Sequence, residues 1–142
     1  MGFNAYLNFG GNCREAFARY QEVFGGELFV QTLGEAPPQE GFEVAPEQKD
    51  LVMHAALMLE DGILMASDAM SPDFGPVQGM YVIYTTKSPE DAQRIFEALA
   101  EGGTVEMPAE PTFWSPMFGV CVDRFGTPWM VNAESSESDS AG

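Results

Sequence analysis

The only histidine of the 142-residue chain, His54, is the first candidate for chemistry. An unperturbed imidazole titrates at about pH 6.5, so it can serve as a general base or donate a hydrogen bond near neutral pH. The surrounding run, "LVMHAALML", reads as a strand, and strict alternation places His54 on one face with Val52, Ala56 and Met58. A buried histidine with satisfied hydrogen bonds is the alternative. No carboxylate stands at a spacing that would make His54 a metal ligand.

Polar residues also lie near the ends of two later strands. Met65 and Ser67 share one face of the run "ILMASDA", and Met130 and Asn132 share one face of "PWMVNA". An apolar wall with a few polar anchors is the usual composition of a ligand site, although strand-end hydrogen bonding is the alternative for both polar residues. Asp68 would act as a general base only if its side chain pointed into the same cavity, and we expect that it does not.

An aromatic pair, Phe113 and Trp114, with Trp129 later in the chain, offers stacking surfaces for a planar or cationic ligand. Aromatic rings also fill barrels and dimer interfaces, so a packing role is the alternative. Asp123 and Arg124 belong to "DRFGT", where we expect a local ion pair or a turn hydrogen bond rather than chemistry.

The usual catalytic motifs are missing. The sequence contains no Gly-x-Ser-x-Gly elbow, no phosphate-binding glycine-rich loop and no His-x-x-x-His or paired-carboxylate metal motif. Cys13 and Cys121 belong to no Cys-x-x-Cys pair, so the sequence predicts neither a disulfide framework nor a zinc site. Both cysteines are expected to be small, partly buried hydrophobic residues.

The charge balance is strongly acidic. Twenty-two acidic residues against six basic ones give a formal charge of −16. Such a field repels nucleic acid and anionic membranes, and it either solvates the surface or steers a cationic ligand. No apolar run approaches the roughly 18 residues of a membrane helix, and the first residues match no signal-peptide pattern. We therefore expect a cytoplasmic protein without nucleic-acid or membrane partners.

The first half of the chain reads as strand, helix and three strands. Alternation predicts a strand over 3–9, and helical spacing of apolar residues predicts a helix over 13–24. Asn12 is expected to cap this helix, with Glu15 completing a capping box. Three more strands are predicted over 27–33, 51–59 and 63–69, with a Pro- and Glu-rich loop over 34–50 and an Asp-Gly hairpin turn before the last strand.

The same order returns after a Pro- and Gly-rich link. A strand over 80–86 precedes a helix whose start is marked by Ser88 as cap, Pro89 at the first position and Asp91 at the third. Three strands follow, over 104–110, 113–122 and 128–133, with prolines expected at edges or bends; these are Pro108, Pro111 and Pro116.

The two halves repeat at a constant offset. Four positions of the first helix align with four of the second; the pairs are Ala16 with Ala92, Tyr20 with Phe96, Val23 with Leu99, and Gly26 with Gly102. An internal repeat outranks any single motif as evidence of architecture. The sequence therefore predicts an α+β protein of two tandem βαβββ modules, about 1–70 and 79–133, in a single domain over 1–133. An acidic, serine-rich tail over 134–142 is expected to be disordered.

Three segments carry a family resemblance: "NFGGNCREAFARYQEVFGGEL", "VMHAALMLEDGILMASDA" and "PTFWSPMFGVCVDRFGTPWMVN". With the two-module order, they resemble the vicinal oxygen chelate superfamily, which includes glyoxalase and the bleomycin-resistance proteins, and within it the PhnB-like branch. The resemblance covers nearly the whole chain up to Asn132. It implies that each module curls its sheet into a half-barrel with the helices on the outer face. It also implies a homodimer that builds each cavity across two chains.

Metal-dependent members of this superfamily hold a cation with His, Glu or Gln side chains on the first and last strand of each module. The corresponding positions here, carried over by spacing, are Ala5, Met65, Met80 and Met130. None of them is a ligand for a hard cation, and methionine sulfur suits only soft ions such as Cu(I). Because methionine is more often core or pocket filler, we expect neither a metal nor another cofactor.

The resemblance thus implies a metal-free cavity that binds a small apolar or aromatic molecule, in the manner of bleomycin-resistance-like sequestration proteins. The expected cavity residues are His54, Met65, Ser67, Met80, Phe113, Trp114, Met130 and Asn132. One alternative is a lyase, isomerase or dioxygenase that uses a metal or His54 as a catalytic residue, and another is an interaction protein with a vestigial cavity. Members are often labelled demethylubiquinone methyltransferases, but no glycine-rich loop of a Rossmann-type methyl-donor site follows the first strand.

Overall fold

The computed structural model describes residues 3–35, 45–69, 75 and 78–134 of the chain. The chain divides into two compact units, Met1–Gly75 and Pro76–Gly142, which we call module one and module two. Parts of the predicted loop over 34–50 and of the link between the modules lie outside the described residues, as does nearly all of the predicted acidic tail.

Each module has the predicted order of elements. Module one contains β1 (Ala5–Phe9), α1 (Cys13–Phe24), β2 (Glu27–Thr32), the short 3-10 helices η1 (Leu33–Glu35) and η2 (Pro46–Gln48), β3 (Val52–Leu59) and β4 (Gly62–Asp68). Module two contains β5 (Val82–Thr86), α2 (Pro89–Ala100), β6 (Thr104–Glu110), β7 (Phe118–Val122) and β8 (Pro128–Ala133). The helix over 13–24 and the strands over 104–110 and 128–133 have the bounds that the sequence predicted.

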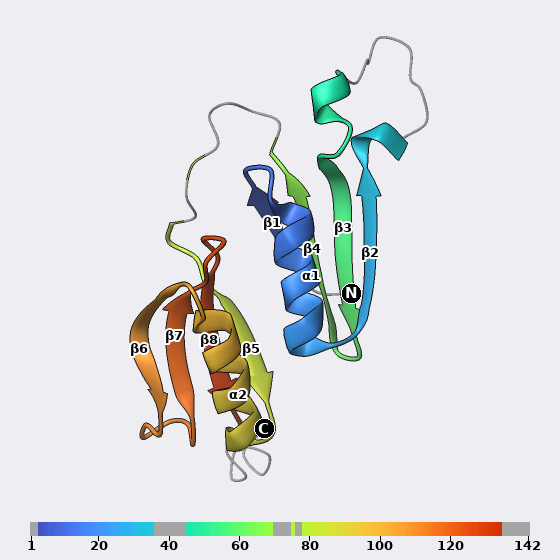
Figure 1. The fold of residues 1–142 in the computed structure, drawn as a ribbon. Helices are drawn as coiled ribbons and strands as arrows, with labels where there is room; N and C mark the ends of the chain where they lie inside the picture. The colour runs from blue at the N-terminus through green and yellow to red at the C-terminus, as the bar shows by residue number, and fades with distance from the viewer. Residues whose placement is uncertain (1–2, 36–44, 70–74, 76–77, 135–142) are drawn as a thin grey trace. The chain divides into compact units, whose positions relative to one another are not determined.

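Both sheets have the same topology. The strand order is β1-β4-β3-β2 in module one and β5-β8-β7-β6 in module two. The first strand of each module is parallel to the last, and the other neighbours are antiparallel. One helix lies across one face of each sheet (Figure 1). The predicted α+β fold of two βαβββ modules is confirmed. None of the described helices is long and apolar enough to cross a membrane.

The helix α1 packs on its sheet through residues spaced three and four apart. Its buried side chains are Cys13, Ala16, Phe17, Tyr20 and Val23. They meet a core stripe on the sheet that is made by Val52, Ala55, Leu57 and Ala66. Alternate residues of a strand point to opposite faces, so this stripe leaves the other face of the sheet without a helix.

The start of α1 differs from the prediction. The side chain of Asn12 makes no capping hydrogen bond. The carboxylate of Asp68, at the end of β4, takes its place: Oδ1 accepts from the backbone N–H of Gly11 at 3.0 Å and of Cys13 at 2.9 Å. Its Oδ2 accepts from the Val52 N–H at 2.8 Å. Asp68 therefore joins the entry of α1, the entry of β3 and the end of β4.

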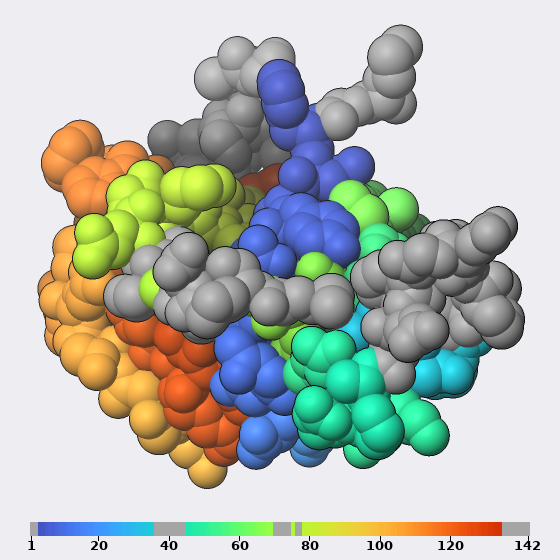
Figure 2. Space-filling view, turned by 90° about the horizontal axis from the view of Figure 1, so that it is seen from above, coloured from blue at the N-terminus to red at the C-terminus, as the bar shows by residue number. Residues whose placement is uncertain are grey.

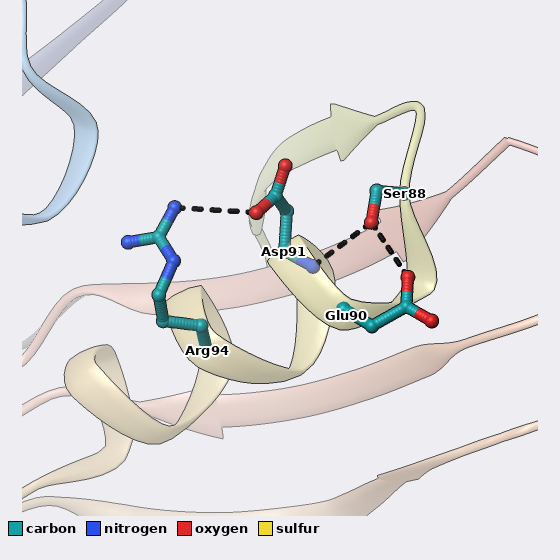
Figure 3. A network of polar contacts seen from close by, with 4 residues as sticks. All are labelled: Ser88, Glu90, Asp91 and Arg94. Atoms are coloured by element: carbon teal, nitrogen blue, oxygen red, sulfur yellow. Dashed lines mark hydrogen bonds and ion pairs between the residues drawn. The ribbon is translucent and has the colours of Figure 1, made fainter.

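The start of α2 is as predicted (Figure 3). Ser88 Oγ accepts from the Asp91 backbone N–H at 3.3 Å, and Pro89 occupies the first turn. The same hydroxyl donates to Glu90 at 2.8 Å, and this hydrogen bond lowers the pKa of the Glu90 carboxyl. Arg94 lies one turn on, 3.7 Å from the Asp91 carboxylate. Acidic groups in a first turn also favour the helix dipole.

The repeat seen in the sequence is a repeat of packing positions. Ala16, Tyr20 and Val23 of α1 are buried, and so are their counterparts Ala92, Phe96 and Leu99 of α2. Close approach of α2 to its sheet depends on Gly119 of β7, because a Cβ there would lie 2.7 Å from the Phe96 ring.

A buried carboxylate also organises the β7–β8 turn. Asp123 Oδ1 accepts from the backbone N–H groups of Phe125 and Thr127, both at 2.9 Å. Its Oδ2 accepts from the indole Nε1 of Trp129 at 2.9 Å. The predicted turn bond is confirmed, and the guanidinium of Arg124 lies 5.0 Å above the ring of Phe125. Trp129 is a core residue, 1% exposed.

Four strands begin later than predicted, and two of these differences move candidate site residues out of a strand. The strand expected over 113–122 starts at Phe118, because residues 112–117 form a loop. Ser115 and Thr112 hold this loop: Ser115 Oγ donates to the Met117 and Ala133 carbonyls at 2.8 and 3.0 Å, and Thr112 Oγ1 accepts from the Ser115 N–H at 3.1 Å. The strand expected over 80–86 starts at Val82, which leaves Met80 outside it.

We expect Asp68→Asn to destabilise the protein by about 2 kcal/mol, because an amide N–H would replace one acceptor and leave a buried backbone N–H unpaired. Urea unfolding at neutral pH measures this. Ser88→Ala, which removes an exposed cap, serves as the comparison and should cost about 1 kcal/mol. An Asp68→Asn protein as stable as the parent would contradict the role given to this carboxylate.

Burial raises the pKa of the Cys13 thiol to about 12 and that of Cys121 to about 11, and the neighbouring Asp68 and Asp123 charges act in the same direction. A thiol with a raised folded pKa contributes stability that is complete below the unfolded value of 9.0 and is lost as pH rises towards about 12. We therefore expect the free energy of unfolding of Cys13→Ala to fall less steeply with rising pH than that of the parent above pH 9.0. Urea midpoints across that range test this, and parallel curves would refute it.

Candidate functional site

Each sheet has one face that its helix does not cover, which we call the open face. In module one this face carries apolar side chains that stay accessible. Tyr6 on β1 is 50% exposed and Phe29 on β2 is 56% exposed, while Met58 and Ile63 are somewhat less so. Register places Phe29 opposite Ala56 and Tyr6 opposite Met65. The open face of module one is therefore an apolar surface presented by all four strands.

His54 lies on this face, but Val52 does not. A register shift between Gln31 and Thr32 makes an irregularity in the β2–β3 pair. Val52 is consequently buried in the core, 1% exposed, whereas His54 is partly exposed with Ala56 and Met58. The prediction of strict alternation across Val52 and His54 was wrong because a β-bulge inserts one extra residue.

Polar residues form a row across the open face of module one. Asn8 pairs with Ser67 in register, and Gln31 pairs with His54. Ala55 pairs with Ala66, so His54 and Ser67 lie one residue further along neighbouring strands. Ser67 Oγ donates to Asn8 Oδ1 at 3.3 Å. We call these four residues row one.

The His54 ring in row one has an aromatic neighbour. Its centroid lies 5.9 Å from that of Tyr6, with the planes tilted by 34°. An imidazole, a hydroxyl and two amides thus stand together beside an aromatic ring. Such a group can orient a polar substituent of a ligand whose apolar part lies on the neighbouring side chains.

Module two has the corresponding row. Thr85 pairs with Asn132, Asn132 with Phe118, and Phe118 with Glu110, so one residue from each strand lies in a line. Residues in register point to the same face of a sheet. We call these four residues row two. Ser67 and Asn132 occupy corresponding places in the two rows, each on the last strand of its module and paired with the first.

The amide of Asn132 is incompletely satisfied. Its Oδ1 is buried and has no hydrogen-bond partner among the described residues. A buried acceptor without a donor costs roughly 1–3 kcal/mol. Row two therefore holds an acceptor that a ligand N–H or O–H group can satisfy.

An aromatic group borders row two. The Trp114 and Phe118 rings are 5.5 Å apart at 70°, and the Phe113 and Trp114 rings are 4.7 Å apart at 85°. Phe113 is 97% exposed and Trp114 is 51% exposed. The orange part of module two, which includes this segment, reaches the surface in the space-filling view (Figure 2). Phe113 and Trp114 belong to a loop rather than a strand, which corrects the prediction.

The far end of the module two face carries a contact between the two edges of the sheet. Tyr81, just before β5, donates its hydroxyl to Glu106 Oε2 on β6 at 3.2 Å. This hydrogen bond and the Glu106 charge raise the pKa of Tyr81. Since β5 and β6 are opposite edges, about 14 Å apart in a flat sheet, the two side chains reach across the open face. Val120, on the same face, is only 4% exposed.

The predicted metal positions do not hold donors for a hard cation. Register shows that Tyr6, not Ala5, faces Met65, and that Ile83, not Met80, faces Met130. Ala5 was therefore assigned one residue away and Met80 three residues away. Two methionines, a tyrosine and an isoleucine do not fit a hard divalent ion. The described residues also contain no group of three His, Cys, Asp or Glu side chains suited to a metal.

Of the predicted site residues, the structure brings His54, Met65 and Ser67 onto one open face, and Met130 and Asn132 onto the other. Phe113 and Trp114 border row two through Phe118, whereas Met80, 69% exposed, precedes β5. Sequence reasoning missed the other members of the rows, which are Asn8, Gln31, Thr85, Phe118 and Glu110. Alternation alone would have put Asn8 and Thr85 on one face with Tyr6 and Ile83, but only the strand register aligns the rows.

The chain matches known proteins along most of its length. The family model of 3-demethylubiquinone-9 3-methyltransferase matches residues 2–132. Protein YjdN of Escherichia coli (strain K12) is 34% identical over 139 residues, 93% of this chain and 95% of that protein. The crystal structure of protein PA1353 from Pseudomonas aeruginosa is 43% identical, with a TM-score of 0.84 over 94% of this chain and 98% of that one.

A third similar structure is the PhnB protein from Bacillus cereus. It is 23% identical, with a TM-score of 0.73 over 94% of this chain and 100% of that one, and it supports the fold alone. Together the sequence match and the two-module fold confirm the predicted resemblance. This chain belongs to the 3-demethylubiquinone-9 3-methyltransferase family, the PhnB-like branch of the glyoxalase fold.

Proposed function

We propose that this protein binds a small apolar or aromatic molecule on the open faces of its sheets, without a metal ion. The observation that carries the proposal is the composition of these faces. Each presents accessible apolar or aromatic side chains around a short polar row, and no hard-cation donor set stands at the family's metal positions.

The energetics favour a ligand with an apolar body. Tyr6, Phe29 and Ile83 are each at least half exposed on the open faces. Covering apolar surface contributes about 25 cal/mol per Å², so a ligand that covers 200 Å² would gain about 5 kcal/mol before the entropy cost of association. The polar rows would then fix the orientation of that ligand.

Methyl transfer, which the family's name suggests, is not part of the proposal. A methyl donor of the nucleotide type needs free backbone N–H groups at the glycine-rich entry of a helix. Here the N–H groups of Gly11 and Cys13, at the entry of α1, already donate to the Asp68 carboxylate.

Binding without a metal is tested with N-phenyl-1-naphthylamine, a neutral probe that brightens when it leaves water. We expect saturable binding by protein that has been dialysed against nickel, zinc, manganese and iron and then washed, with less than stoichiometric metal by elemental analysis. Ile83→Glu should weaken binding about tenfold, because it places a charge on the open face opposite Met130. Val105→Glu is the matched control, because Val105 pairs with Cys121 and so points away from the open face, yet it is 47% exposed and can carry a charge.

Failure of the parent protein to bind this probe would overturn the apolar face as a ligand site. One bound metal per chain that survives washing would overturn the proposal that binding needs no metal. In that case His54 would be the first ligand to test.

A second candidate is an enzyme that uses His54 in proton transfer. It is favoured by the place of the ring on the open face, 5.9 Å from Tyr6 and in one row with Ser67. An enzyme of this kind would need the imidazole to transfer a proton, whereas binding alone needs only the shape and the hydrogen bonds of the ring.

We expect His54→Ala to change the affinity for the naphthylamine probe by no more than about threefold, because the ring contributes only part of the apolar face. Titration with the probe measures the effect, and His54→Gln is the hydrogen-bonding control. Should a turnover activity be found, a loss of about 100-fold in His54→Ala would replace the binding proposal with the enzyme.

A further inference from the structure

We propose that row two selects a flat molecule that bears a positively charged N–H donor, such as an amidinium or a protonated aminoheterocycle. This inference deepens the proposed function and rests on it. Its basis is the juxtaposition of a hydroxyl, a buried unpartnered amide oxygen, an aromatic ring and a carboxylate on one line of the sheet, from Thr85 through Asn132 and Phe118 to Glu110.

The polar atoms of row two are mainly hydrogen-bond acceptors, so they favour a ligand that donates. Asn132 Oδ1 is buried and lacks a donor among the described residues, and the Glu110 carboxylate accepts hydrogen bonds only. The Thr85 hydroxyl can accept as well as donate. A ligand with several N–H groups in one plane satisfies such a set, whereas a carboxylate or phosphate ligand would meet an acceptor and a negative charge.

The basic side chains of module two do not supply these donors from within the row. Arg94 lies on α2 with Asp91, and Arg124 lies over Phe125 in the β7–β8 turn. Lys87 follows β5, which ends at Thr86. The row itself contains one acidic residue and no basic one, so a cationic ligand would meet no positive charge within the row.

The neighbouring rings favour a flat cation. Phe118 stands between Asn132 and Glu110 in the row, and Trp114 packs against it at 5.5 Å. A cation over an aromatic face gains about 0.5–1 kcal/mol at an exposed site and more when water is excluded. Trp114 and Phe113 are both exposed, so a planar ligand can reach their rings.

The net charge of the chain also favours a cationic ligand. The chain carries a formal charge of −16, which raises the local concentration of cations around it. Within module two, Glu106 and Glu110 both lie on β6 at the border of the open face. Row one differs, since it contains no carboxylate and its Asn8 Oδ1 already accepts from Ser67. The preference for a cation therefore belongs to module two.

The experiment compares three probes of one shape: biphenyl-4-carboxamidine, which is cationic, the neutral biphenyl-4-carboxamide and the anionic biphenyl-4-carboxylate. Calorimetric titration of the full chain is run in 0.15 M and 0.5 M salt, because the −16 net charge attracts any cation non-specifically. We expect the amidine to bind at least about tenfold more tightly than the amide at both salt concentrations, and the carboxylate to bind least.

Two variants locate the binding. Glu110→Gln and Glu97→Gln change the net charge equally, but Glu97 lies on α2, where it accepts from Gln93 at 3.2 Å. We expect Glu110→Gln to lose at least about tenfold in amidine affinity and to keep its amide affinity. Glu97→Gln should leave both affinities unchanged. Asn132→Leu should weaken both the amidine and the amide, since either can donate to Oδ1.

Each other outcome counts against the inference. Equal affinities for amidine and amide would overturn the cation preference and leave the proposed function standing. Equal effects of Glu110→Gln and Glu97→Gln would show attraction by net charge alone. If Trp114→Ala lowered the molar mass measured by light scattering, a second copy of the chain would be the occupant. If neither the biphenyl probes nor the naphthylamine bound, the proposed function itself would fail.

Discussion

The structure of module one depends on one buried carboxylate. Asp68 is 5% exposed, and its two oxygens accept from backbone N–H groups that lie 16 to 57 residues away in sequence. A charge can stay buried only when such hydrogen bonds replace its water. Asp68 therefore fixes the end of β4 against the starts of α1 and β3, and the rest of the module builds on that junction.

Module two also has a buried carboxylate, but at a different place in the fold. Its helix has a local serine cap, and its buried carboxylate, Asp123, sits in the β7–β8 turn and holds the indole of Trp129. In module one Asp68 joins the helix to the sheet, whereas in module two the apolar side chains of α2 hold the helix to its sheet. The other face carries the polar rows because strand neighbours in register must point the same way. The candidate binding faces thus follow from where the helices are anchored.

Local patterns predicted the elements well, and long-range contacts explain the failures. The bounds of α1 followed from apolar spacing and paired glycines, and the Ser88 cap from a signal within four residues. The supposed Asn12 cap failed because the actual partner, Asp68, is more than fifty residues away. Val52 was placed on the wrong face because a bulge is invisible to alternation.

The candidate site was only partly predictable for the same reason. Ser67 and Asn132 were found because alternation along their own strands places each on one face with a methionine. Glu110 and Phe118 were not found as row members, because β6 is irregular and its register with β7 shifts twice. The positions of all the missed residues within the rows are set by their pairing with a neighbouring strand, which local sequence does not reveal.

The placement of the two tryptophans has a spectroscopic consequence. Both belong to module two, but Trp129 is 1% exposed with its Nε1 bound to a carboxylate, whereas Trp114 is 51% exposed beside row two. Tryptophan emission of this protein, excited where tyrosine does not absorb, therefore contains a buried component and an iodide-quenchable one, and both components come from module two. Without any label, Trp129 thus reports on the core of module two and Trp114 on its open face.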